Sequence, residues 1–151
     1  MRVFKIIAWI ALILFIIIQF FPTEKNESYT TPDNDFMVVN NVPSKIENQL
    51  KVSCYDCHSN STSYPWYNKI QPAAWYLEDH VKEGKAELNF NEWSTYSDRR
   101  KDSKLRSIIK QIESGEMPMD SYTLIHRDAI LSENIKNSVI SYMRILKDSL
   151  K

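Results

Sequence analysis

Five consecutive residues carry the clearest chemistry in the chain: Cys54-Tyr55-Asp56-Cys57-His58. The pattern C-x-x-C-H is the attachment sequence for c-type haem. Its thiols add across the two vinyl groups of haem, and residues three apart share one side of a helical turn, so both cysteines can reach the porphyrin edge. His58 follows directly, where its imidazole can bind the iron. The sequence therefore predicts one haem c per chain, attached through Cys54 and Cys57, with His58 as the proximal ligand.

Three other uses of the cysteines compete with haem attachment. A C-x-x-C redox pair normally accompanies a βαβ pattern, and no segment alternates like a strand. A zinc site could combine Cys54 and Cys57 with two of the three histidines, but neither His80 nor His126 belongs to a second closely spaced ligand pair. A structural disulfide is compatible with a chain outside the cytosol, but it gives His58 no role. Haem attachment uses the whole motif, and the chain has only 2 cysteines.

Met117 is the predicted sixth ligand of the iron. It follows the helix-ending Gly115 closely and precedes Pro118, which restricts its backbone. A methionine on a loop downstream of C-x-x-C-H is a common source of this ligand. Met119 would lie on the same face as Met117 if the loop is extended. Three side chains thus remain as alternatives, because each offers a sulfur or a nitrogen that binds iron: Met119, His80 and His126.

Helical periodicity accounts for most of the remaining chain. With only 2 glycines and no alternating segment, an all-β fold is disfavoured. We expect an all-α class, a small cytochrome c-like bundle of about four short helices around one covalent haem. In the first helix, Ile46, Leu50 and Cys54 share a face, which brings the cysteine to the buried side. The predicted helices begin at Pro43-Ser44, lie between Pro72 and Gly84, run from about Arg99 to Ser114, and begin after Ser132.

The chain begins with an apolar run from Ile6 to Phe21, preceded by Arg2 and Lys5. Bulky residues occupy the places where a cleaved signal peptide needs small ones, so the run predicts an uncleaved transmembrane helix. The basic residues would keep the N-terminus cytoplasmic. These observations predict a single-pass protein of the inner membrane whose haem domain lies in the periplasm. The expected division is 1–21 anchor, 22–41 linker and 42–151 haem-binding domain.

Charge and motif content limit the classes of function that fit the sequence. Lys and Arg number 19, as do Asp and Glu, so no strong field points to nucleic acid. No acid, base and nucleophile are arranged for turnover, which favours an electron carrier over an enzyme. Electron transfer implies a redox partner protein that the sequence does not identify. A haem-based sensor or peroxidase-like enzyme would need an open sixth position, and a zinc-binding structural module is the third possibility.

Four short motifs together resemble the bacterial haem-binding domain family. They are residues 54–60 (C-Y-D-C-H-S-N), 64–67 (Y-P-W-Y), 89–93 (N-F-N-E-W) and 115–118 (G-E-M-P). The resemblance covers roughly residues 42–146 and implies a cytochrome c-like haem protein of a kind that is exported and often membrane-anchored. Family members often carry a second proline after the Met-Pro pair, where this chain has Met119. The resemblance implies no established reaction.

Overall fold

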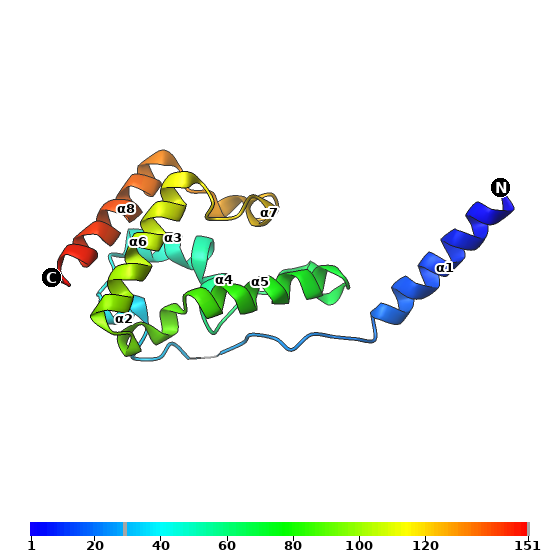
Figure 1. The fold of residues 1–151 in the computed structure, drawn as a ribbon, viewed down its shortest axis with the longest axis horizontal. Coiled ribbons are helices and arrows are strands. Elements are labelled where there is room, and N and C mark those ends of the chain that lie inside the picture. Colours follow the sequence, from blue (N-terminus) through cyan, green and yellow to red (C-terminus); the bar gives the residue numbers. More distant parts are fainter. Residues whose placement is uncertain (29, 151) are drawn as a thin grey trace.

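The computed structural model describes residues 1–28 and 30–150, and the regular structure within these ranges is helical (Figure 1). The α-helices are α1 (Arg2–Ile18), α2 (Phe36–Val39), α3 (Ser44–Leu50), α4 (Asp56–His58), α5 (Ala73–Glu87), α6 (Asp98–Ser114), α7 (Asp120–Thr123) and α8 (Glu133–Asp148). A π-helical turn, η1 (Lys51–Tyr55), joins α3 to α4, and the 3-10 helices are η2 (Trp66–Lys69), η3 (Phe90–Thr95) and η4 (Arg127–Ala129). The predicted all-α class is confirmed.

The four predicted helices of the domain are present as α3, α5, α6 and α8. The side chain of Ser97 caps α6, and Gly115 ends it with the left-handed φ of 77° that glycine adopts without strain. Ser132 precedes α8 as predicted, but its side chain makes no capping hydrogen bond. Gly84 does not end α5, which continues beyond it. Between α6 and α8, segment 120–131 contains α7 and η4.

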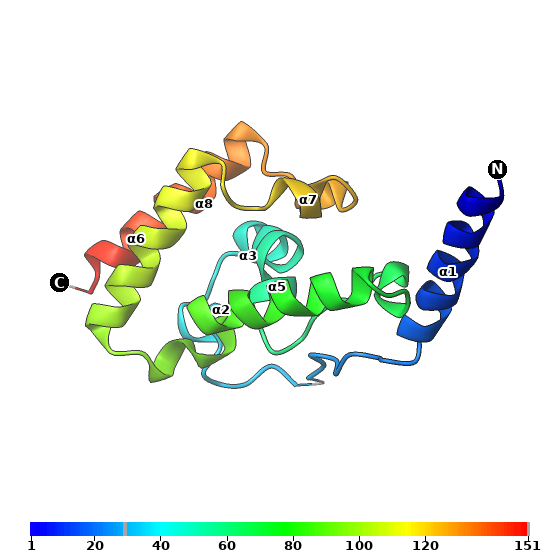
Figure 2. The same cartoon turned by 45° about the vertical axis from the view of Figure 1, so that its right-hand side comes forward.

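The core forms where α6 and α8, which lie side by side in Figures 1 and 2, pack on α3, α2 and η3. Each of these elements contributes large apolar side chains that are almost fully removed from water, and each such side chain stabilises the fold by roughly 1.5–3 kcal/mol. The most deeply buried of them are Phe36, Leu50, Phe90, Leu105, Val139 and Met143. The helix that carries the cysteines is thus anchored in the core through its first turns.

The segment predicted to be a linker, residues 22–41, contributes α2 to the core. Asp35 caps this helix, because its side chain accepts a hydrogen bond from the backbone N–H of Met37 in the first turn. Phe36 is 0 % exposed, and its ring centroid lies 5.2 Å from that of Phe90 and 4.9 Å from that of Trp93. The packed part of the chain therefore includes residues before position 42.

The prediction of a transmembrane helix is wrong. Helix α1 has 17 residues and is therefore about 25 Å long, which is less than the roughly 30 Å of a bilayer's hydrocarbon core. Among residues 1–28 and 30–150, no helix is long and apolar enough to cross a membrane. The helix ends at Ile18, and the side chain of Gln19 exchanges hydrogen bonds of 3.1 and 3.0 Å with the backbone of Gln71.

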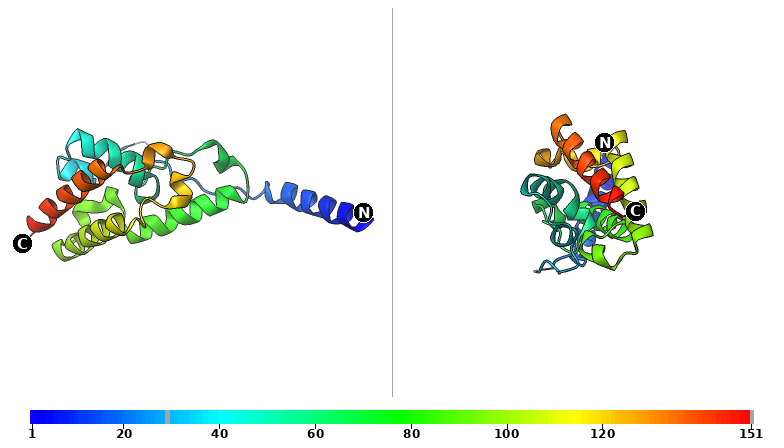
Figure 3. Two further views of the ribbon diagram at one scale, coloured as in Figure 1. Left: turned by 90° about the horizontal axis from the view of Figure 1, so that it is seen from above. Right: turned by 90° about the vertical axis from the view of Figure 1, so that its left-hand side faces the viewer.

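The localisation that depended on this span is wrong for the same reason. A single-pass protein of the inner membrane with a periplasmic haem domain requires a spanning helix, and the described residues do not contain one. Helix α1 projects away from the domain in Figures 1 and 2, with none of its residues buried, and the left-hand view of Figure 3 shows the chain termini at opposite ends of the molecule.

Replacing Phe36 tests whether α2 belongs to the core. Phe36→Ala should lower the free energy of unfolding by about 3–5 kcal/mol, because it leaves a cavity between Phe90 and Trp93. Val38, on the same helix, is 50 % exposed, so Val38→Ala should change stability by about 0.5 kcal/mol or less. Denaturant unfolding followed by circular dichroism measures both. Two equally small effects would show that α2 is not part of the core.

Candidate functional site

The C-x-x-C-H motif lies on one uninterrupted helical segment made of α3, η1 and α4. Cys54 is in the π-helical turn, whereas Cys57 and His58 are in α4. Cys54 packs against the hydrophobic core, together with Leu50 and Ile46 one and two turns earlier. The four-residue spacing of these residues therefore correctly indicated which side of the helix is buried. The motif is rigid because its first half is part of the core.

His58 is held by the C-terminal end of α5. Its Nδ1–H donates to the carbonyl oxygen of Gly84 at 2.8 Å and to that of Leu88 at 3.1 Å. A carbonyl can only accept, so the proton is on Nδ1 and the lone pair of the neutral ring is on Nε2. Burial is the main cause that lowers the pKa of His58 below its ordinary value. The imidazole is therefore neutral at pH 7, with Nε2 prepared to bind a metal.

Gly84 makes this arrangement possible because α5 and α4 approach each other closely there. A Cβ atom at position 84 would lie 2.6 Å from the carbonyl oxygen of Cys57 and 3.1 Å from its Cβ. No side chain fits at the first of these distances, which involves a backbone atom. The glycine inside α5 thus allows the second cysteine and His58 to sit directly against the helix.

The state of the thiols bears on the competing uses of the cysteines. Burial raises the pKa of Cys54 to about 12 and that of Cys57 to about 11. Both are therefore thiols at pH 7, whereas a redox pair attacks through a thiolate of lowered pKa. Both cysteines are free, not joined in a disulfide. Within residues 1–28 and 30–150, no group of three or more His, Cys, Asp or Glu side chains could hold a metal ion, so the zinc site is not formed.

A buried polar network holds Tyr55, the first of the two residues between the cysteines. Tyr55 stacks on Phe90 with ring centroids 4.9 Å apart, and its hydroxyl donates to Asp35 at 3.1 Å. Asp35 is 0 % exposed and also accepts from the amide of Asn91 at 2.7 Å. The side-chain oxygen of Asn91 in turn accepts from the backbone N–H of Asn60, 2.6 Å away. Two motifs far apart in sequence, C-Y-D-C-H-S-N and N-F-N-E-W, are thereby joined.

The extended chain that follows α1 holds the loop after the motif. The side-chain amide of Asn26 donates to the carbonyl of Ser59 and to the hydroxyl of Thr62, both at 2.9 Å. Its side-chain oxygen accepts from Lys85 on α5 at 2.6 Å, and its backbone N–H donates to the hydroxyl of Tyr64 at the same distance. One asparagine therefore links the Y-P-W-Y segment, the loop and α5.

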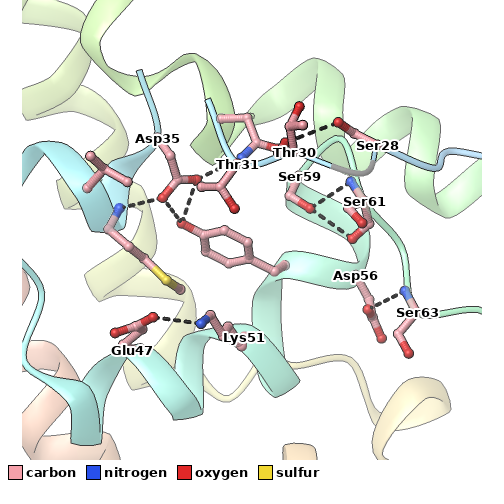
Figure 4. Close-up of a pocket in the computed structure, with 14 residues that line it drawn as sticks. Ser28, Thr30, Thr31, Asp35, Glu47, Lys51, Asp56, Ser59, Ser61 and Ser63 are labelled. Atoms are coloured by element: carbon pink, nitrogen blue, oxygen red, sulfur yellow. Dashed lines mark hydrogen bonds and ion pairs between the residues drawn. The ribbon is translucent and has the colours of Figure 1, made fainter. Parts of the chain in front are cut away.

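A cavity of about 650 Å³ lies beside the motif (Figure 4). Tyr55 and Asp56 line it, but Cys54, Cys57 and His58 do not. Its wall is made largely of Ser and Thr hydroxyls and of groups that already have partners, such as the Glu47–Lys51 ion pair. The cavity is therefore not the place where the cysteines and His58 would hold a cofactor.

The two methionine candidates for the sixth ligand lie on the turn between α6 and α7, and both are partly buried. The backbone N–H of Met117 donates to the carbonyl of Gln111 at 3.2 Å. The carbonyl of Met119 accepts from the backbone N–H groups of Tyr122 and Thr123, both at 3.0 Å. Both backbones are therefore constrained, not only that of Met117. Neither sulfur has a described contact with His58.

The two histidine candidates differ in their relation to the motif. His80 donates from Nδ1 to the Tyr76 carbonyl on its own helix at 2.8 Å, and no described interaction links it to the motif. His126 stacks on Tyr122, with ring centroids 4.3 Å apart and planes at 10°. Its Nε2 lies 3.0 Å from the hydroxyl of Tyr67. Only His126 is thus connected to the motif through a neighbouring residue, since the Tyr122 hydroxyl lies 2.7 Å from Asp56.

Several residues that shape the site were missed in the sequence. Asp35 precedes an apolar run and could have been recognised as a helix cap. Gly84 interrupts a helical pattern, which often indicates close packing. Leu88 acts through its carbonyl group, which every residue has, and Tyr122 has no fixed spacing from the cysteines. No sequence pattern points to either of these two residues.

Comparison with protein-family models identifies one match: the haem-binding domain, over residues 13–145. The matched range contains the C-x-x-C-H motif, α5 and the turn that carries the methionines. Searches of curated proteins and of solved structures find no significant match. The family match covers most of the chain and identifies haem as its cofactor.

Gly84→Ala tests the close approach of α5 to Cys57. At an unconstrained position inside a helix, alanine would stabilise by about 1 kcal/mol relative to glycine. Here the methyl group would meet the Cys57 carbonyl, so we expect a loss of about 1–3 kcal/mol in the free energy of unfolding and a lower yield of haem-loaded protein. Glu83→Ala, at the exposed neighbouring position, is the control and should be near neutral. A stabilised Gly84→Ala variant would contradict the close packing.

Proposed function

The chain belongs to the haem-binding domain family, and on this premise we propose that it carries one haem c and transfers single electrons. The observation that supports this most directly is the state of His58. Its Nδ1–H donates hydrogen bonds to two backbone carbonyls, so the lone pair of Nε2 is available to bind iron. The two cysteines of the same motif are free thiols. A neutral imidazole of fixed orientation next to a C-x-x-C pair fits an axially bound, covalently attached haem.

Cys54 and Cys57 are the proposed attachment residues. Each thiol would hold the haem through one thioether bond, in which the sulfur is joined to one carbon of a vinyl group and the thiol hydrogen to the neighbouring vinyl carbon. The raised pKa values keep both sulfurs protonated before this addition. When bound, haem supplies the one-electron chemistry of its iron.

His58 is the proposed proximal ligand and Met117 the proposed sixth ligand, with Met119, His80 and His126 as alternatives. The hydrogen bonds from Nδ1–H to the carbonyls of Gly84 and Leu88 make the Nε2 lone pair more basic, so His58 would bind the iron more strongly. The backbone bond from Met117 to Gln111 restricts the turn, so less chain entropy opposes binding by a weak thioether ligand.

Electron transfer is the reaction class that this arrangement supports best. His58 and Met117 would both bind the iron and leave no place for a substrate, and the electron would pass to a separate redox partner protein. A haem-based sensor or peroxidase-like enzyme would instead need a sixth position that is open or easily displaced. The ligation state of the iron therefore decides between the two classes.

The attachment is tested by extraction. Haem should remain with the denatured wild-type protein through acid–acetone treatment, because thioether bonds survive it. The Cys54→Ala, Cys57→Ala double variant should lose its haem under the same treatment. Haem that leaves the wild-type protein freely would refute covalent attachment.

The sixth ligand is tested by spectroscopy of the ferric and ferrous protein. With Met117 bound, the ferric protein should show the weak near-infrared sulfur-to-iron band, and the ferrous protein should not react with carbon monoxide. Met117→Ala should abolish the band and open the iron, whereas Met119→Leu should leave both properties unchanged. If wild type lacks the band and His80→Ala or His126→Ala is the change that opens the iron, the ligand is a histidine instead. A wild-type protein that binds carbon monoxide readily would favour sensing or catalysis.

A further inference from the structure

The turn that carries the two methionines is attached to the C-x-x-C-H motif by a tyrosine. The hydroxyl of Tyr122, on α7, lies 2.7 Å from a carboxylate oxygen of Asp56 and 3.1 Å from the carbonyl of Val52. Asp56 stands between the two cysteines in sequence. A hydrogen bond to a carboxylate is roughly twice as strong as one between neutral groups. This bond therefore connects α7 to the centre of the attachment motif.

A second connection reaches the same turn from η2. His126 stacks on Tyr122, and its Nε2 lies 3.0 Å from the hydroxyl of Tyr67. The pKa values of Tyr122 and Tyr67 are both raised, mainly by burial, then by Asp56, and further by Cys57. Both phenols are therefore protonated donors at neutral pH, and both lie near the second cysteine.

The backbone of the turn transmits this attachment to the methionines. The N–H of Tyr122 donates to the carbonyl of Met119 at 3.0 Å, within a single turn of helix. Met117 lies two residues before Met119. Its backbone N–H donates to the carbonyl of Gln111 on α6. The turn is thus fixed at both ends, by α6 at its start and by the Tyr122–Asp56 bond at its end.

We propose that Tyr122, supported by Tyr67 and His126, is a positioning clamp that holds the Met117–Met119 turn against the C-x-x-C-H motif and keeps the sixth position of the iron closed. The clamp rests on the proposed function, since it presupposes an attached haem with a ligand from this turn. It acts through the turn and touches neither ligand itself. Asp56 is then more than a spacer between the cysteines, because its hydrogen bond with Tyr122 couples the attachment segment to α7.

Tyr142 provides a matched control. Like Tyr122 it is partly buried, and its hydroxyl donates to a backbone carbonyl, that of Asn40, at 3.1 Å. It lies on α8, in contact with the core and not with the motif. Tyr142→Phe therefore removes one hydroxyl and one hydrogen bond elsewhere in the same domain, which separates a loss of general stability from a loss of the clamp.

The experiment compares wild type, Tyr122→Phe and Tyr142→Phe as haem-loaded proteins. Covalent haem is measured by the pyridine haemochrome spectrum, the sixth position by carbon monoxide binding to the ferrous protein, and the turn by hydrogen exchange of the amides of residues 117–126. Loss of a bond to a carboxylate should open the turn about tenfold more often. Tyr122→Phe should therefore bind carbon monoxide about tenfold faster with unchanged haem content, whereas Tyr142→Phe should match wild type. Tyr67→Phe, which removes only the second connection, should give a smaller change in the same direction.

The outcomes separate the clamp from the proposed function. Carbon monoxide binding that is the same in Tyr122→Phe and wild type, or equally altered in Tyr142→Phe, would overturn the clamp. A wild-type protein that already binds carbon monoxide freely would overturn it as well. Absence of covalent haem in wild type would refute the proposed attachment and, with it, the role of the clamp at the iron, but not the hold of Tyr122 on the Met117–Met119 turn. In that case hydrogen exchange decides, because faster exchange of residues 117–126 in Tyr122→Phe alone supports this hold and unchanged exchange rejects it.

Discussion

The close packing of α4 on α5 at Gly84 is the contact on which the site depends. It brings the carbonyl of Gly84 in α5, and that of Leu88 directly after the helix, within reach of the His58 ring, and those two hydrogen bonds fix the tautomer and direction of the imidazole. A larger residue at position 84 would push α4 outward, and the carbonyls would no longer reach Nδ1. The tautomer of His58 thus depends on Gly84, a residue without a side chain that lies 26 residues later in the sequence.

The rest of the site is organised by polar groups that are hidden from water and therefore need partners. Burying Asp35 is costly unless its oxygens are satisfied, and three donors satisfy them: the Tyr55 hydroxyl, the Asn91 amide and the backbone N–H of Met37. Each partner belongs to a different element, so the carboxylate joins α2, η1 and η3. Each oxygen of the carboxylate accepts from two of these donors, because the Tyr55 hydroxyl lies within hydrogen-bond distance of both, at 3.2 and 3.1 Å. Such a fully satisfied network makes the three elements rigid relative to one another.

Sequence patterns predicted the helices well and the site partly. The helices of the domain follow from apolar periodicity, and the C-x-x-C-H motif lies on a helix with Cys54 toward the core, as its spacing indicated. Two expectations about the N-terminal part differ from the structure for physical reasons: the transmembrane helix, and a linker over residues 22–41. Hydropathy shows that a run is apolar but not where its helix stops, and polar composition concealed Phe36, which is a core residue. The carbonyls that hold His58, and the tyrosine that reaches Asp56, act across long sequence distances that no local pattern records.

The two sides of the site differ in how much chain must be closed into a loop to form them. The contact between His58 and Gly84 spans 26 residues, whereas that between Asp56 and Tyr122 spans 66. By the logarithmic dependence of closure entropy on length, the longer loop costs about 0.8 kcal/mol more. The contact that orients His58 is thus the more local one, and the contact that joins α7 to the motif is the more distant one in sequence. During folding the histidine side is therefore expected to become ordered first, while the opposite side is still accessible to a cofactor arriving from solution.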